Sequence, residues 1–456
     1  MAPSYATPSQ FSRSVTRSGT PNSTMCVRVE YAVRGSLLVV ALCLIVFLAT
    51  IPAAAYYGEP DKISFTAFWE KRLAENVLQK NRDFYISLSN ASYDSQRNLL
   101  LVTYEHAFYN ELGKLGSRLV TEVLDCRSGR SVGAFVCPEE GGRKGPTLIV
   151  LPSRIGVYSN SLAVTCEEED VLLLINGETG LTLETYDMTS GVQQARLELV
   201  QRESSWIAIH LPVVRKVYLF DPVKKIKIDK EADTFDWEYD VFEVQASKRS
   251  IELKKIVSFR SRRYSTVRLY VCPTCSGRKL AWIQHDGKQD LLEIYDPIMR
   301  KFEGPPRILP SHVAAIIRND GSIDLVPILW LDEQNWRWFQ HTPGPGPGQP
   351  GDKLTIWDHQ EKKPIGTICY PRGIHLSIFD FDANGNLHAA FGNYETHIVD
   401  TQRIATVAKV ADDKPKQDQK CRGGLLSPDG NLLFRFIEEA PTVLKVKVYK
   451  RTMLER

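Results

Sequence analysis

The sequence predicts an all-β domain that follows a single membrane-spanning helix. Residues 35–57 contain no charged side chain, whereas from residue 84 onward short runs of Val, Ile, Leu, Tyr and Phe alternate with clusters of Gly, Asp, Asn and Pro. Runs of that length between turn residues are typical of β-strands. A third observation, an aspartate that recurs at the ends of these runs, indicates that the strands come in similar units of roughly 40 to 50 residues.

The apolar run at residues 36–55 contains 20 residues, which is about the length that a helix needs to cross a bilayer. The residues before it carry four arginines and a single glutamate. By the positive-inside tendency, this asymmetry keeps the N-terminus in the cytoplasm and places the C-terminal domain on the other side. We therefore expect residues 1–35 to be a disordered basic tail and residues 36–57 to be a transmembrane anchor.

A cleavable signal sequence is the alternative for this segment. Pro52 interrupts the helix, and Ala53, Ala54 and Ala55 are the small residues that a signal peptidase accepts before Tyr56. Cleavage near Ala55 would give a secreted protein. The apolar run is longer than the core of roughly 7 to 15 residues that signal peptides have, which favours the uncleaved anchor.

The charge balance excludes one class of partner. The chain has 57 Lys and Arg against 54 Asp and Glu, a formal net charge of +3. A nucleic-acid-binding domain needs a strong positive field, so we expect no nucleic-acid partner.

A short helix is predicted between the membrane and the all-β domain. Phe65, Phe68, Trp69 and Leu73 recur at helical spacing with charged residues between them. We expect residues 58–84 to form a stalk helix that packs on the domain.

Alignment of the strand-ending aspartates gives the repeat. The aligned positions are Asp125, Asn176, Asp221, Asp296, Asp358 and Asp400. Tight-turn dipeptides follow the last three aspartates, at Asp320-Gly321, Asn384-Gly385 and Asp429-Gly430. The separations (320 − 296, 384 − 358 and 429 − 400) are 24, 26 and 29 residues, so they are nearly constant. With a last unit ending near Tyr449, this phasing predicts about seven units.

The chain after residue 84 resembles WD-repeat-like β-propellers. The resemblance is carried by Trp357-Asp358, Tyr295-Asp296, Phe220-Asp221 and the segment LLSPDGNLL at residues 425–433. It implies that residues 85–456 form a β-propeller of about seven four-stranded blades. Two intervals exceed the repeat, so we expect insertions near residues 228–275 and 330–352.

The first insertion contains a basic run that includes Arg260, Arg262 and Arg263. Basic and apolar residues alternate there as on the solvated outer face of a strand. The other interpretation is a surface for anionic lipid headgroups or an acidic polymer.

The basic run is followed by Cys272 and Cys275, a Cys-x-x-Cys step. Two thiolates at this spacing are half of a zinc site. No second pair follows, so the step is a weak metal candidate, and a disulfide or plain loop cysteines are favoured. We expect no cofactor.

The second insertion carries Trp330, Trp336, Trp338 and Phe339 beside a Pro/Gly tract. Aromatic residues dominate binding hot spots, so these four are the candidates for a protein contact. Packing of the same rings on their own blade is the alternative.

Two functions remain open for the domain. The first is a membrane-anchored scaffold that binds another protein on the non-cytoplasmic side. The second is a propeller enzyme, a hydrolase or lyase with its active site in the central channel. The sequence contains no phosphate-binding Gly-Lys-Ser/Thr loop and no His-Glu-x-x-His motif, which favours the scaffold, and we predict no catalytic residues.

Overall fold

The computed structural model describes residues 63–75, 83–109, 112–136, 148–150, 161–166, 171–176, 181–199, 206–229, 234–264, 270–274, 276–285, 290–308, 315–317, 323–325, 330–332, 337–342, 352–358, 363–371, 379–392, 394–411 and 419–453. The chain divides into two units, Met1–Pro60 and Asp61–Arg456, and every described residue belongs to the second. The predicted basic tail at residues 1–35 and transmembrane anchor at residues 36–57 therefore lie outside the described residues. Within the described ranges, no helix has the length and apolar character that a membrane crossing needs.

Among the described residues, seven sheets follow one another along the chain, five with four strands and two with five, and we number them blades 1 to 7. Blade 1 has β2 (Asp83–Asp94), β3 (Leu99–Tyr109), β4 (Leu115–Asp125) and β5 (Ser131–Val136). Blade 2 has β7 (Ser161–Thr165), β8 (Val171–Asn176), β9 (Leu181–Asp187) and β10 (Gln193–Leu199). Blade 3 has β11 (Trp206–Leu211), β12 (Lys216–Asp229), β13 (Thr234–Ala246) and β14 (Ile251–Tyr264), and β6 (Leu148–Val150) pairs with β11 in parallel.

The remaining blades have the same order. Blade 4 has β15 (Tyr270–Pro273), β16 (Leu280–His285), β17 (Asp290–Asp296), β18 (Lys301–Phe302) and, also on β17, β19 (Arg307–Ile308). A separate hairpin, β20 (Ala315–Ile317) and β21 (Ile323–Leu325), precedes blade 5, which has β22 (Trp330–Asp332), β23 (Arg337–Thr342), β24 (Lys353–Asp358) and β25 (Lys363–Cys369). Blade 6 has β26 (Phe379–Phe381), β27 (Leu387–Phe391), β28 (Glu395–Asp400) and β29 (Ala405–Ala411). Blade 7 has β30 (Lys420–Leu426), β31 (Leu432–Ala440), β32 (Val443–Met453) and β1 (Ile63–Arg72).

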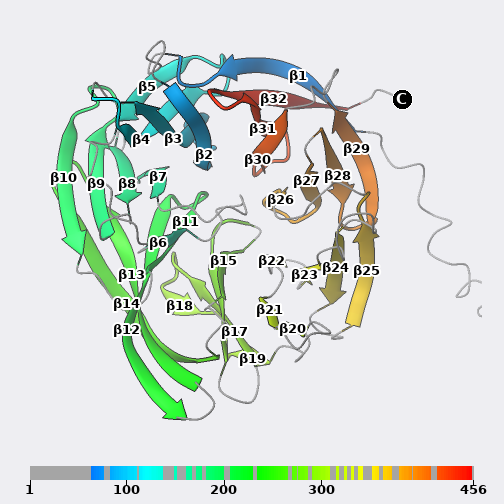
Figure 1. Cartoon of the computed structure of the whole chain (residues 1–456). Helices are drawn as coiled ribbons and strands as arrows, with labels where there is room; N and C mark the ends of the chain where they lie inside the picture. Colours follow the sequence, from blue (N-terminus) through cyan, green and yellow to red (C-terminus); the bar gives the residue numbers. More distant parts are fainter. Residues whose placement is uncertain are drawn as a thin grey trace, which may run out of the picture. The chain divides into compact units, whose positions relative to one another are not determined.

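The blades stand around a central axis, with the first strand of each blade innermost, except that β6 lies on the inner side of β11 in blade 3 (Figure 1). Neighbouring blades are in contact through the strand pairs β2 and β7, β10 and β14, β11 and β15, β15 and β22, β26 and β30, and β30 and β2. Blades 5 and 6 share a core that contains Phe339, Ile356 and Phe381. The prediction of a seven-bladed all-β propeller is confirmed.

The N-terminal strand closes the ring. β1 pairs antiparallel with β32, so the outermost strand of blade 7 comes from the start of the domain and the other three from its end. A β-bulge at Phe68 interrupts the ladder between Ala67 and Trp69. Since successive strand residues face opposite sides, the bulge puts Ile63 in the core shared with blade 6 and Trp69 against the core shared with blade 1.

The predicted stalk helix at residues 58–84 is wrong in its described part, because residues 63–72 are a strand. The bulge explains the error. On each side of the bulge, side chains alternate between the two faces of the strand, and the bulge adds one residue to this alternation. The apolar residues Phe65, Phe68 and Trp69 therefore occur at spacings of three and one, which resemble the spacing in a helix. The open edge of β32 then determines the structure, as tertiary pairing commonly overrides a local pattern.

The strand-ending aspartates cap the turn between the third and fourth strands of a blade. Asp125, Asp187, Asp296 and Asp400 each end a third strand and accept, through Oδ1, the backbone N–H of a residue two positions further on, at 2.9 to 3.0 Å. The backbone hydrogen bond to Arg127 is the main cause that lowers the pKa of Asp125. A short polar side chain at this position satisfies turn N–H groups that no strand partner reaches.

Two of the aligned positions do not have this role. Asn176 ends the second strand of blade 2, and Asp221 is buried within β12. The capping residue of blade 2 is Asp187, which the alignment missed. In blade 3 the cap is Ser247, whose Oγ accepts the N–H of Ser250 at 3.1 Å.

The described parts of the two expected insertions, near residues 228–275 and 330–352, are strands of the blades. Residues 234–264 are the long strands β13 and β14 of blade 3. Trp330–Asp332 and Arg337–Thr342 are the first two strands of blade 5. The chain gains length there through longer strands and through the β20–β21 hairpin.

Candidate functional site

The predicted aromatic contact residues lie on the first hairpin of blade 5. Trp330 is on β22 and Trp338 on β23, while Trp336 and the side chains of both strand tryptophans lie outside the described residues. Phe339 is 0% exposed, and its ring centroid is 4.6 Å from that of Phe381. Phe339 is therefore a core residue, and its prediction as a contact residue is wrong.

The predicted basic residues lie on β14, the outermost strand of blade 3. In the ladder with β13, Arg260 lies opposite Glu238, Arg262 opposite Asp236 and Arg263 opposite Phe235. Arg260 Nη2 is 3.7 Å from Glu238 Oε1. The alternation with acidic partners agrees with the solvated-strand interpretation, and the lipid-surface interpretation stays a prediction.

The predicted cysteine pair lies at the start of blade 4. Cys272 is on β15, and Cys275 falls outside the described residues. Cys126, Cys166, Cys369 and Cys421, which belong to four different blades, are thiols. In the part of the chain that the structure describes, no three His, Cys, Asp or Glu side chains are grouped as metal ligands.

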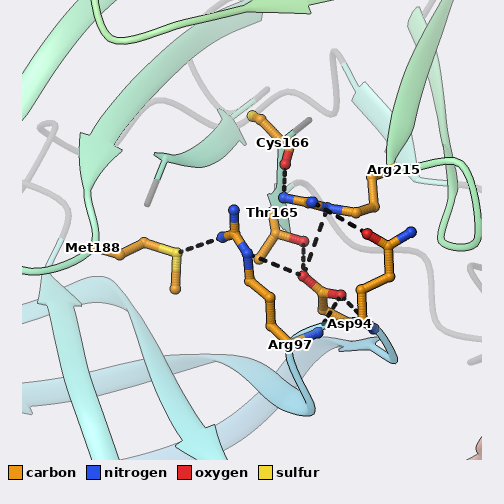
Figure 2. Close-up of polar contacts among 7 residues, drawn as sticks. Asp94, Arg97, Thr165, Cys166, Met188 and Arg215 are labelled. Atoms are coloured by element: carbon orange, nitrogen blue, oxygen red, sulfur yellow. Dashed lines mark hydrogen bonds and ion pairs between the residues drawn. The ribbon is translucent and has the colours of Figure 1, made fainter. Parts of the chain in front are cut away.

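A buried carboxylate joins blades 1, 2 and 3 at their innermost turns (Figure 2). Asp94 ends β2 and is 3% exposed. Its Oδ2 accepts a hydrogen bond from Thr165 Oγ1 at 2.9 Å and lies 3.7 Å from Arg215 Nε and 4.0 Å from Arg97 Nε. Two guanidinium groups thus compensate one buried carboxylate, the condition under which a buried charge is tolerated.

Arg215 of blade 3 contacts residues of both other blades in this network (Figure 2). It lies in the β11–β12 turn with a φ of 54° and donates to the Cys166 carbonyl through Nη2 and to Gln96 Oε1 through Nη1 at 3.5 Å. One side chain of blade 3 therefore holds the corresponding turns of blades 1 and 2. The geometry is that of a structural clamp.

A cavity of about 350 Å³ lies between blades 2 and 3, next to this clamp. Its wall includes the cations Arg215 and Lys216 and the carboxylates of Glu243 and Glu252. Lys216 Nζ lies 2.8 Å from Glu243 Oε1. The wall thus carries two positive and two negative side chains. Its charge therefore favours neither a cationic nor an anionic ligand.

Four exposed apolar side chains gather at the β3–β4 hairpin of blade 1. Phe84 is 47% exposed, Tyr109 42%, Leu112 81% and Leu115 56%. The rings of Phe84 and Tyr109 make an edge contact at 5.7 Å, and Tyr109 lies opposite Leu115 in the ladder. Single exposed apolar residues are common, whereas several on one hairpin are a candidate interaction surface. We call these four residues the blade 1 patch.

The local sequence holds the patch outside the core. Gly113 has a φ of +71° with open space around it, which allows the chain to turn between Leu112 and Leu115. Lys114 lies between the two leucines and is exposed. Arg118, which lies 4.9 Å from the Phe108 ring centroid, faces the other side of the sheet from Tyr109 and Leu115, so Lys114 is the cation next to the patch.

Sequence reasoning missed the blade 1 patch. The signal present in the chain is Leu-Gly-Lys-Leu at residues 112–115, where leucines flank a turn glycine. Turns normally carry polar residues, so apolar residues on both sides of a turn are a reason to look for a contact.

The chain matches no protein-family model and no curated protein. Among solved structures it is similar to the Dos1 propeller, with 10% identity, a TM-score of 0.45 and coverage of 85% of this chain and 95% of that one. It is also similar to the Myceliophteria thermophila Cps50 (Swd1) β-propeller domain, with 12% identity, a TM-score of 0.41 and coverage of 81% and 98%. A chain of the mitotic checkpoint complex gives 11% identity, a TM-score of 0.39 and coverage of 86% and 96%. The fold assignment given above follows from the sheet topology of this chain itself.

Proposed function

We propose that this protein is a membrane-anchored β-propeller that acts as a protein-binding scaffold on the non-cytoplasmic side. The observation that supports the scaffold function is the blade 1 patch. Exposed aromatic and aliphatic residues that touch one another give a partner a desolvated centre, and such centres carry most of the energy of an interface.

The rim of the patch defines the partner that we propose. Lys114, which is exposed between Leu112 and Leu115, places a positive charge beside the apolar side chains. A partner segment with apolar residues flanked by Asp or Glu would complement both features, because opposite charges at a rim favour the correct partner and repel the wrong one.

The anchor is proposed from the sequence and is compatible with closure of the ring by β1. The strand begins at Ile63, eight positions after Ala55. Retention of residues 36–55 would therefore tether the ring closely to the membrane, and cleavage before Tyr56 would leave β1 in the mature chain. The secreted form is the alternative that cleavage would produce.

The test is partner capture with charge introduced into the patch. In intact membranes, we expect Leu112→Asp combined with Leu115→Asp to reduce the crosslinked partner at least tenfold, because two carboxylates would occupy an apolar interface and face the acidic flank of the partner. Crosslinking, affinity capture and mass spectrometry measure the recovery. The identified partner must contain an apolar segment flanked by acidic residues, and a synthetic peptide of that segment must compete.

The matched control is Ile298→Asp combined with Met299→Asp, since both side chains are at least 60% exposed but lie in the turn before β18 of blade 4. We expect this control to keep full recovery. Equal recovery from the patch variant and the control would contradict the proposal. A parallel variant, Trp336→Ala with Trp338→Ala, examines the blade 5 hairpin, and loss of the partner only in that variant would move the contact there.

A further inference from the structure

An aromatic ring and a cation project together from the outer part of blade 7. Phe68 occupies the bulge of β1, the outermost strand of this blade (Figure 1), and its side chain is 44% exposed. Lys450 of β32 extends over it, with Nζ 5.8 Å from the centroid of the Phe68 ring. A cation at this distance is attracted to the face of an aromatic ring.

The β4–β5 turn of blade 1 brings two more cations to the same place. Trp69 Nε1 donates to the Cys126 carbonyl at 2.8 Å, and a Cβ added to Gly129 would lie 2.9 Å from the Trp69 ring. The turn therefore packs on β1 next to the bulge. Arg127 and Arg130 lie in this turn, and both side chains are exposed.

Positive charge exceeds negative charge on this surface. In the described part of the chain, no acidic side chain forms an ion pair with Arg127, Arg130 or Lys450. The two nearby acids are already engaged, because Asp125 accepts hydrogen bonds within its own turn and Asp429 does so within the β30–β31 turn. The three cations are thus available to an anionic ligand.

An exposed valine extends the apolar part of the surface. Val132 follows the turn on β5 and is 52% exposed. The surface therefore combines apolar side chains with cations. We call it the tether patch, and its members are Phe68, Arg127, Arg130, Val132 and Lys450.

The tether patch lies close to the start of the domain. β1 begins at Ile63, and Phe68 is five positions further along the same strand. If the proposed anchor at residues 36–57 is retained, residues 58–62 are the link to β1. Five residues reach at most about 18 Å when fully extended. This end of blade 7 is then held near the bilayer, whatever the orientation of the other blades.

The chemistry of the tether patch fits a lipid surface. Lysine and arginine close to an anionic bilayer are attracted to its headgroups, and aromatic side chains favour the headgroup level. An acidic protein would offer similar charge, but it must reach the patch by diffusion. The tether keeps the bilayer at a high effective concentration beside the patch, so we favour the lipid.

We propose that the tether patch binds the anionic lipid headgroups of the bilayer in which the chain is anchored. This inference rests on the proposed anchor and is independent of the blade 1 patch. Contact at the tether patch adds to the covalent link and restricts the rotation of the ring about it.

The experiment measures lysine acetylation on the full chain in lipid nanodiscs. One set of nanodiscs contains phosphatidylcholine alone, and the other contains three parts of phosphatidylcholine to one part of phosphatidylglycerol. An uncharged acetylating reagent and mass spectrometry give the rate at Lys450. The reference is Lys409, which is exposed on the outermost strand of blade 6. We expect acetylation of Lys450 to be at least fivefold slower on the anionic nanodiscs, with an equal rate at Lys409 on both.

Charge reversal localises the contact. Arg127→Glu combined with Arg130→Glu leaves the Lys450 probe in place and should abolish the difference between the two lipids. The control, Lys353→Glu combined with Lys420→Glu, reverses two exposed cations on β24 and β30 and should preserve it. Circular dichroism of both variants verifies that the ring is folded.

The outcomes separate this inference from the proposed anchor. A chain that co-purifies with the nanodiscs but shows equal rates at Lys450 on both lipids would overturn the lipid contact alone. A chain that does not co-purify with either lipid would overturn the anchor and this inference together. In both cases the blade 1 patch would remain to be judged by partner capture.

Discussion

Removal of β1 is expected to unfold the domain. A chain that begins at Asp61 keeps the closing strand, whereas a chain that begins at Glu75 loses Ile63, Trp69, Leu73 and Ala74, which lie in or against the cores on both sides of blade 7. Burial of the three larger side chains alone contributes about 5 to 9 kcal/mol, which is comparable with the whole free energy of unfolding of an ordinary domain.

Circular dichroism, with thermal or guanidinium unfolding, measures the effect. The shorter chain should have no cooperative transition, or one at a much lower midpoint, because β32 would be left with an open edge and two apolar interfaces would be exposed. A peptide of residues 61–74 added in excess should restore part of the transition. Identical midpoints for the two chains would mean that β1 does not contribute to the stability of the ring.

Trp282→Ala is expected to have the largest effect of any single substitution that we propose. Trp282 is among the largest fully buried side chains, and its ring stacks on Phe259 of the neighbouring blade at 5.4 Å. Truncation leaves a cavity between blades 3 and 4, at a typical loss of about 3 to 5 kcal/mol. The midpoint of guanidinium unfolding at unchanged m-value measures the loss, and a loss below about 1 kcal/mol would contradict this packing.

Trp282→Phe separates packing from hydrogen bonding. Trp282 Nε1 donates to Glu293 Oε2 at 2.9 Å, and burial raises the pKa of Glu293 while this hydrogen bond lowers it. A folded-state pKa above the unfolded value means that stability is highest below the ordinary pKa of a glutamate and falls as pH rises through the folded pKa. Without the indole donor the folded pKa should rise further. We therefore expect Trp282→Phe to lose more stability at pH 7 than at pH 4.

The repeat could be predicted from the sequence because the turn chemistry is local. An aspartate that caps a turn lies within a few residues of the groups it binds. The alignment therefore identified the turn aspartates Asp125, Asp296 and Asp400 correctly. The alignment misplaced the turn of blade 3 for two reasons. Ser247 caps that turn in place of an aspartate, and the buried Asp221 resembles a strand-ending aspartate in the sequence. The count of seven units nevertheless held, since chain length limits the number of blades.

Ring closure and burial could not be predicted in the same way. The role of β1 depends on the open edge of β32, which lies at the other end of the chain, and the bulge at Phe68 hides the period of the strand. Likewise, Phe339 and Leu112 are both large apolar residues in the sequence. Only the packing of blade 6 on Phe339 and the turn that exposes Leu112 distinguish the buried residue from the exposed one.

Hydrogen exchange of residues 63–73 in the full chain tests the closed ring most directly. β1, β32 and β31 form one continuous ladder, so their amides should be protected together. We predict that the amides of β1 exchange as slowly as those of β31, apart from the bulge at Phe68. Exchange of β1 at the rate of an unstructured peptide, while β31 stays protected, would contradict closure of the propeller by its N-terminal strand.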